Sequence, residues 1–205
     1  MKKAAVVMII FFFVPILSTA YASGAMDQLT GPIDEVISIL KDPQYQDEAQ
    51  KEVQREKLWD VITKVFDFDK ISQLALGKYR KKFDDPKMAE YTEAFTKLIG
   101  NTYLKRIQGE FKNEKVKYLE EIPGSKPDKA MVKTLIVREN AEIPVDYSMW
   151  LNNGNWRIYD VRVEGVSLVK NYRNQFTKIL FKDSPDQLIE RIKKKNEGNE
   201  SDIEE

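Results

Sequence analysis

The stretch from residue 142 to residue 168, EIPVDYSMWLNNGNWRIYDVRVEGVSL, decides the fold. Two runs rich in Val, Ile, Tyr and Trp are separated by the turn-forming residues 152–155, a pattern typical of two strands joined by a tight turn. Two similar runs, 115–121 and 130–138, precede this pair. Four consecutive strands with short connections predict an antiparallel meander.

The spacing of apolar residues predicts how the last two strands pair. A two-residue loop at Asn153 and Gly154 would place the apolar residues of the two strands on opposite faces. We expect a three-residue loop over 153–155 instead, because a one-residue slip would expose the whole apolar set. The pairs that this loop predicts are Met149 with Tyr159, Tyr147 with Val161, and Val145 with Val163.

Helical periodicity surrounds the strands on both sides. Asp85 followed by a proline predicts a helix start, Gly77 a helix end, and the run SPDQ at 184–187 a capping box. Gly100, inside a helical pattern, predicts a kink or a close packing contact. We therefore expect an α+β fold, a four-stranded antiparallel meander wrapped by six to seven helices. The main expected helices cover residues 26–41, 48–65, 69–76, 86–109, 167–181 and 184–195.

The apolar face of the sheet and the apolar stripes of helices 86–109 and 167–181 are predicted to face each other. Tyr and Met side chains are adaptable enough to line a cavity and to place polar atoms at its rim. An ordinary packed core is the alternative. The candidate lining residues are Phe95, Leu98, Ile99, Val145, Tyr147, Met149, Tyr159, Val161, Val163, Val169, Tyr172 and Phe176.

The pattern of residues at the N-terminus predicts a targeting segment. Two lysines precede fourteen mostly apolar residues, and the run AYA at 20–22 fits a signal-peptidase site. A transmembrane anchor is the alternative, but a bilayer-spanning helix needs about 20 apolar residues. We expect residues 1–22 to be a signal peptide, 23–195 a single domain outside the cytoplasm, and 196–205 a disordered acidic tail.

The composition excludes much of enzyme chemistry. The chain has no Cys and no His, so disulfides, thiolate nucleophiles, histidine-based zinc sites and Ser-His-Asp triads are excluded. Its 33 basic and 33 acidic residues balance, which argues against a nucleic-acid partner. We expect neither a cofactor nor a metal. Asp146 and Asp160, beside Tyr147 and Tyr159, are candidate general bases. The alternative is that both are ordinary hydrogen-bond acceptors.

Several segments together resemble the MlaC family, also called toluene-tolerance (Ttg) proteins. The run GNWRIYDV at 154–161 and the following EGVSL resemble its G-x-W-x-x-Y-D-V…E-G-V-S-[LM] signature. LGKY at 76–79, YTEAFTKL at 91–98, VDY at 145–147 and YRNQF at 172–176 are similar to further family segments. The resemblance spans about residues 28–195.

This resemblance implies a soluble, monomeric periplasmic phospholipid carrier with an NTF2-like, cone-shaped fold around an apolar cavity. The candidate lining residues then become candidate lipid-binding residues. The implied partners are the phospholipid ligand, an inner-membrane ABC transporter with an MCE-domain subunit, and an outer-membrane lipoprotein–porin complex; a related branch carries hopanoids. Two other classes stay open: a small isomerase or hydratase using Asp146 or Asp160, and an interaction module with a solid core.

Overall fold

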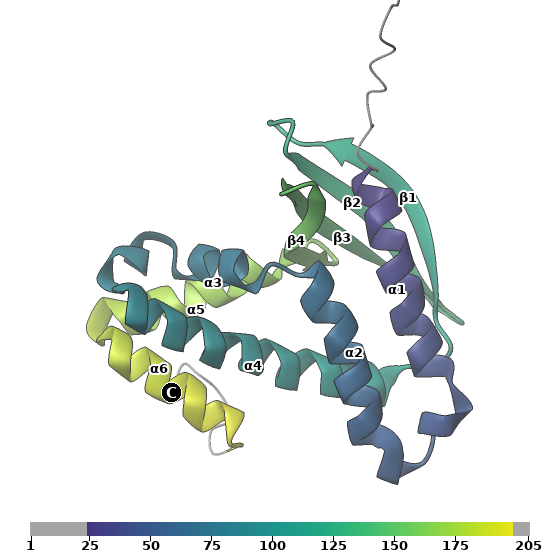
Figure 1. The fold of residues 1–205 in the computed structure, drawn as a ribbon, viewed down its shortest axis with the longest axis horizontal. Helices are drawn as coiled ribbons and strands as arrows, with labels where there is room; N and C mark the ends of the chain where they lie inside the picture. The colour runs from purple at the N-terminus through teal and green to yellow at the C-terminus, as the bar shows by residue number, and fades with distance from the viewer. Residues whose placement is uncertain (1–23, 199–205) are drawn as a thin grey trace, which may run out of the picture.

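A computed structural model describes residues 24–198, which form six α-helices, three 3₁₀ helices and one five-stranded sheet (Figure 1). The expected signal peptide, 1–22, and residues 199–205 of the expected tail lie outside the described residues. Between residues 24 and 198, no helix combines the length and the apolar character needed to cross a bilayer. The elements are α1 (Ala25–Lys41), η1 (Pro43–Tyr45), η2 (Glu48–Gln50), α2 (Lys51–Val65), α3 (Phe68–Leu76), η3 (Gly77–Lys82), α4 (Asp85–Glu110), β1 (Lys115–Pro123), β2 (Lys129–Arg138), β3 (Ala141–Asn152), β4 (Asn155–Val163), β5 (Val166–Ser167), α5 (Leu168–Lys182) and α6 (Pro185–Asn196).

The sheet is an antiparallel meander in the order β1-β2-β3-β4-β5, which confirms the predicted topology. The predicted number of strands, four, is wrong. Glu164 and Gly165 both have positive φ, 51° and 81°, so the chain folds back on β4 within two residues. Val163 then pairs with Val166. Because β5 has only two residues, it has no alternating pattern by which the sequence could predict it.

The β3–β4 hairpin corrects the predicted loop. The loop has two residues, Asn153 and Gly154, with φ of 50° and 82°, the positive values that a type I′ turn requires. Tyr147 pairs with Val161 and Val145 with Val163, as predicted, but Met149 pairs with Ile158 and not with Tyr159. Tyr159 is the extra residue of a β-bulge. The bulge shifts the register by one residue, so the tight turn and the apolar pairing are compatible.

The helix ends follow local chemistry. The Ser184 capping box is confirmed, and Gly77 ends α3 with φ of 53°. Helix α4 begins one residue earlier than predicted, because Asp84 and not Asp85 is the N-cap, accepting a hydrogen bond from the Lys87 backbone N–H at 2.9 Å. Gly100 marks a close packing contact, since a Cβ there would lie 3.0 Å from the Trp59 ring.

Helix α1 lies on the sheet, and α3, α4, α5 and α6 pack against one another beside it (Figure 1). Helix α1 packs against β1, β2 and β4, whereas α4 packs against α2, α3 and α6. The expectation that helix 86–109 covers the apolar face of the sheet is therefore wrong: α1 covers that face. We call the resulting apolar cluster the sheet layer; its buried members are Ala25, Leu29, Val65, Ala130, Val132, Val145, Tyr147, Met149 and Ile158. We call the second cluster, formed by buried apolar residues of α3, η3, α4, α5 and α6 together with Phe83, the helical core. Leu104 of α4 lies instead in a smaller third cluster with Leu40 and Leu58.

Candidate functional site

Four of the predicted lining residues on the strands belong to the sheet layer or pack against it. Val145, Tyr147 and Met149 are buried in it, and Val161 is half-buried against it. Alternation along β2 and β3 directs these side chains to one face, because successive strand residues point to opposite sides. Cross-strand pairing then places Val132 beside Tyr147. The prediction of one apolar sheet face is confirmed for these positions.

Among the buried members of the sheet layer, Tyr147 is the one with a polar side-chain group. Burial raises the pKa of its phenol to about 12, and a side-chain hydrogen bond with Thr134 partly offsets this rise. The hydroxyl of Thr134 itself donates to the Val145 carbonyl at 2.8 Å. Tyr147 is therefore neutral near pH 7 and presents an uncharged wall to anything in the layer.

Hydrogen bonds between residues 26–34 of α1 and the sheet hold this helix in place. The Met26 backbone N–H donates to Glu121 Oε2 at 2.8 Å, and the Trp156 N–H donates to Gln28 Oε1 at 2.7 Å. The hydroxyl of Tyr118 on β1 donates to Asp34 Oδ1 at 3.0 Å. Burial, then the hydrogen bond to Asp34, raises the pKa of Tyr118, so this donor keeps its proton.

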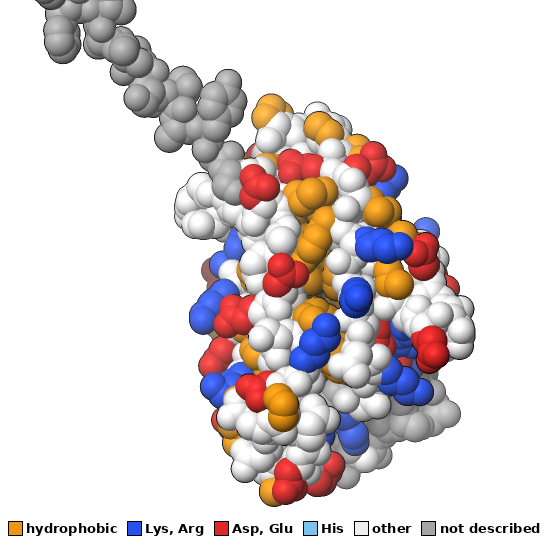
Figure 2. All heavy atoms as spheres, turned by 90° about the vertical axis from the view of Figure 1, so that its right-hand side faces the viewer, with side chains coloured by type: hydrophobic (Ala, Val, Ile, Leu, Met, Phe, Trp, Pro, Cys, Tyr) orange, Lys and Arg blue, Asp and Glu red, His pale blue; other side chains and the backbone are white. Residues whose placement is uncertain are grey.

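The sheet layer reaches the surface along the boundary between α1 and the sheet. Met26 and Ile33 on α1, and Ile136 and Ile143 on the sheet, are half-buried members of the layer. The side of the molecule formed by α1 and β1 carries a strip of hydrophobic side chains, with charged residues on either side (Figure 2). An exposed apolar strip of this kind is typical of a surface that meets an apolar ligand or partner.

The six predicted lining residues on the helices lie in the helical core. Its rings pack closely: the Phe95 centroid is 4.8 Å from that of Tyr172 and 5.1 Å from that of Phe176, both edge-to-face. Such contacts are typical of a close-packed core. The structure thus does not bring the helix set and the sheet set together. Phe95, Leu98, Ile99, Val169, Tyr172 and Phe176 are members of the helical core.

The α2–α3 junction connects the two clusters. Phe66 packs against both of them and forms a parallel bridge with Ile158 on β4. The Asp67 backbone N–H donates to the Ile158 carbonyl at 2.8 Å. Arg157 Nη2 donates to the Phe66 carbonyl at 2.6 Å. The two halves of the molecule are therefore joined by directed hydrogen bonds as well as by apolar packing.

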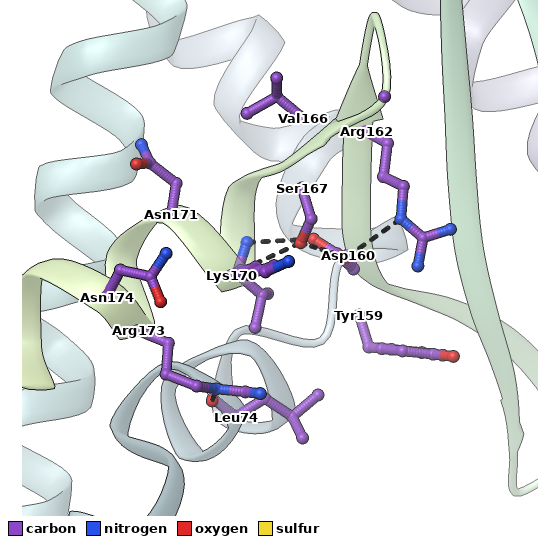
Figure 3. Close-up of a pocket in the computed structure, with 12 residues that line it drawn as sticks. Leu74, Tyr159, Asp160, Arg162, Val166, Ser167, Lys170, Asn171, Arg173 and Asn174 are labelled. Atoms are coloured by element: carbon purple, nitrogen blue, oxygen red, sulfur yellow. Dashed lines mark hydrogen bonds and ion pairs between the residues drawn. The ribbon is translucent and has the colours of Figure 1, made fainter.

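An open pocket of about 780 Å³ lies between α3, β4, β5 and the start of α5 (Figure 3). Tyr159 lines it because the bulge turns this residue away from the sheet layer. Arg162, Lys170 and Arg173 give the pocket a positive character. Arg173 also donates from Nε to the Leu74 carbonyl at 2.7 Å, an end carbonyl of α3. Of the predicted lining residues, Tyr159 and Val169 line this pocket, and Val163 lies on the surface, 46% exposed.

The two carboxylates considered as general bases, Asp160 and Asp146, each lie next to protein groups that can pair with them. Asp160 is buried, and its oxygens accept hydrogen bonds from Ser167 Oγ at 2.7 Å and from the Val169 backbone N–H at 3.0 Å. It holds the first turn of α5 on β4. Asp146, half-buried, lies beside Lys133 and Arg162 in the strand pairing. Within the described residues, no group of three acidic side chains could hold a metal ion.

Sequence reasoning missed the role of α1. The apolar spacing of Leu29 and Ile33 predicts a helix with one apolar side, but it does not identify the surface that this side covers. Met26 and Ala25 were not among the candidate residues, although both contact the sheet layer. The signal was an amphipathic helix at the start of the domain with no partner assigned to it.

Comparisons with known proteins agree with this architecture. The sequence matches the family described as MlaC protein over residues 31–194. A comparison with curated proteins found no match. A solved structure of a phospholipid-binding protein from Ralstonia solanacearum, in complex with a phospholipid, is similar to this chain with a TM-score of 0.75 and 19% identity, covering 86% of this chain and 99% of that one. This similarity shows a shared fold. The family match covers most of the sequence, and the chain therefore belongs to the MlaC family.

Proposed function

We propose that this protein is a periplasmic phospholipid carrier that shelters acyl chains in the sheet layer. The observation that carries the proposal is the apolar layer between α1 and the sheet, whose half-buried members Met26, Ile33, Ile136 and Ile143 surround its buried residues. The Ralstonia solanacearum protein of the same fold binds a phospholipid, which supports the same ligand class here. The cone and the enclosed cavity predicted from the sequence remain part of this proposal.

The energetics favour a carrier. Two acyl chains contain about 30 methylenes, and each costs about 0.8 kcal/mol to expose to water. A free phospholipid therefore crosses an aqueous compartment very slowly, whereas a protein with an apolar layer removes most of this cost. The head group stays in water, where its charge needs no buried partner. Carriage needs no nucleophile, metal or imidazole.

Helix α1 is the element that we propose to move when lipid enters. Gly31 and Pro32 lie in the middle of α1, and proline has no N–H to complete the helical hydrogen-bond pattern. Hydrogen bonds of Met26, Gln28 and Tyr118, together with the packing of Ala25 and Leu29 in the sheet layer, hold α1 on the sheet. The interrupted hydrogen-bond pattern at the centre of α1 is the reason that we propose this helix as the moving element.

The lipid is proposed to move between two membrane complexes. The donor and acceptor implied by the family are an outer-membrane lipoprotein–porin complex and an inner-membrane ABC transporter with an MCE-domain subunit. The chain itself is proposed to be exported through residues 1–22 and to act as a monomer. Maintenance of outer-membrane lipid asymmetry is the proposed result.

Native mass spectrometry of protein purified from a Gram-negative host tests the proposal. We expect the wild type to carry phospholipid, and Tyr147→Glu, which puts a charge into the sheet layer, to lose it. Ile136→Glu, a milder variant at the half-buried edge, should lower the bound fraction while circular dichroism stays unchanged. Ile107→Glu on α4, at an exposed position outside the layer, is the matched control. Wild-type protein that is free of lipid and cannot be loaded would refute the proposal.

The identity of the bound lipid separates the remaining alternatives. Extraction and mass spectrometry distinguish a phospholipid from a hopanoid, because a phospholipid contains phosphorus. Lipid retained equally by Tyr147→Glu and Ile136→Glu would place the binding site outside the sheet layer.

A further inference from the structure

Positive charge is concentrated on two neighbouring elements. Helix α5 contains four basic residues and no acidic residue, and η3 has four basic residues among six and no acidic one. The whole chain is balanced, with 33 basic and 33 acidic residues, so this is a segregation of charge within a neutral composition. The basic residues are Lys78, Arg80, Lys81, Lys82, Lys170, Arg173, Lys178 and Lys182.

The two elements form one continuous surface. Lys82 Nζ donates to the Leu180 carbonyl at 3.0 Å, which joins the end of η3 to the last turn of α5. The ammonium groups of Lys78 and Lys82 lie 5.2 and 5.1 Å from the centroid of the Tyr79 ring. This surface is at the end of the helical half, remote from β1 and α1 (Figure 1).

The nearby carboxylates have hydrogen-bond or ion-pair partners outside this surface. Asp183 pairs with Arg191 at 3.0 Å, and Asp84, which keeps its charge, accepts the N-cap hydrogen bond of α4. Lys81 and Lys182 are exposed, and within the part of the chain that the structure describes neither forms an ion pair with a carboxylate.

Phe181 lies within this charged surface and is 77% exposed, more than any other large hydrophobic residue described. It is in the last turn of α5, directly before Lys182. An exposed aromatic ring surrounded by lysines is the side-chain combination that binds the interface of an anionic bilayer: the ring enters the head-group region and the ammonium groups meet lipid phosphates. We call the exposed residues Lys78, Lys81, Lys82, Phe181 and Lys182 the basic face.

We propose that the basic face docks the protein directly on a membrane surface rich in anionic phospholipid, with Phe181 inserted at head-group level. An anionic bilayer fits better than a folded protein partner, because Phe181 is largely exposed in the last turn of α5 and its flanking cations are flexible lysines, which bind as point charges. The docking is independent of what the sheet layer holds, so either proposal can fail without the other.

Sedimentation with sucrose-loaded vesicles tests the docking. We expect the full chain to bind vesicles of 70% phosphatidylcholine and 30% phosphatidylglycerol at 50 mM NaCl, and to bind pure phosphatidylcholine vesicles far less. Lys81→Ala/Lys182→Ala should lower the partition coefficient about 30-fold, from about 1 kcal/mol per lysine near the surface. Phe181→Ala should lower it about tenfold.

The controls remove equivalent side chains elsewhere. Lys57→Ala/Lys105→Ala removes two exposed lysines outside the basic face, and Leu119→Ala removes an exposed apolar residue of β1. Both should bind as the wild type does. Equal binding to neutral and anionic vesicles, or variants of the basic face that bind normally, overturns the proposal. Binding to immobilised polyglutamate without vesicle binding also overturns it, and assigns the surface to an acidic protein.

The readouts keep this proposal distinct from phospholipid carriage. Lipid content measured by native mass spectrometry should be the same in Phe181→Ala and in the wild type, because Phe181 belongs to neither apolar cluster. Circular dichroism should also be unchanged, since the residue is exposed.

Discussion

The indole Nε1 of Trp150 donates a hydrogen bond to Oδ2 of Asp67 at 2.9 Å, and this bond joins β3 to the first turn of α3. The other oxygen of the same carboxylate caps α3 by accepting from the Lys70 backbone N–H at 2.8 Å. The Lys70 ammonium in turn lies 4.6 Å from the centroid of the Trp150 ring. One carboxylate thus begins a helix and attaches it to the sheet.

A double-mutant cycle measures this connection. Trp150→Phe keeps an aromatic ring, although a smaller one, and removes the donor, whereas Asp67→Ala removes the acceptor. We expect a coupling of about 1.5 kcal/mol in the free energy of unfolding, because a hydrogen bond to a charged group contributes about 1.5–3 kcal/mol and this one is only partly buried. Urea denaturation of the four proteins gives the value. A coupling below about 0.3 kcal/mol would show that the bond does not hold the two elements together.

Replacement of the two glycines of α4, Gly100 and Gly109, by alanine is predicted to have opposite effects on stability. Gly100→Ala should destabilise the protein, because the new Cβ would lie 3.0 Å from the Trp59 ring. Gly109→Ala has no atom within 4 Å of its new Cβ and should stabilise the helix by about 0.5–1 kcal/mol. Thermal denaturation of both variants is the measurement. A stabilised Gly100→Ala variant would contradict the close contact.

Asp160 is predicted to act in stability and not in catalysis. Asp160→Ala removes the acceptor of the Ser167 hydroxyl and of the Val169 N–H, which we expect to cost about 2 kcal/mol of unfolding free energy. Asp146→Ala, at a half-buried strand position, is the comparison and should stay within about 0.5 kcal/mol of the wild type. Lipid content should be normal in both variants. Turnover of a carbonyl substrate that disappears in Asp160→Ala would instead support an enzyme.

The raised pKa of Tyr147 predicts a loss of folding stability at high pH. Its pKa is raised from 10 to about 12 in the folded protein, so between these values the unfolded chain releases this proton and the folded chain keeps it. Stability from this group is complete below pH 10 and is lost as the pH rises to about 12, by roughly 2–3 kcal/mol over two pH units.

Tyr147→Phe tests this pH dependence because it keeps the ring and removes the ionisable hydroxyl. Its stability should fall less steeply between pH 10 and 12 than that of the wild type, measured by urea denaturation. Parallel curves for Tyr147→Phe and the wild type would mean that Tyr147 titrates as an exposed tyrosine.

Much of this architecture could be predicted from the sequence because it depends on local chemistry. Proline, serine and glycine positions fix helix ends within one or two residues, as the Ser184 capping box illustrates. The alternation of apolar residues fixes the pairs Tyr147–Val161 and Val145–Val163, since the wrong parity would place polar residues opposite the buried Val145 and Tyr147. The family resemblance, carried by the segment around Trp156, was also present in the sequence and is confirmed.

Tertiary structure alone decided which apolar surfaces meet. Periodicity shows that a helix has an apolar side but not which neighbour it covers, so the helices of residues 86–109 and 167–181 were assigned to the sheet, although α1 covers its apolar face. The pairing around Tyr147 was predicted correctly, but the two-residue turn at Asn153 and Gly154 was rejected, because the sequence does not show the bulge at Tyr159 that makes the two compatible. A bulge is a backbone response to two constraints at once, and it exists only when both strands are in place.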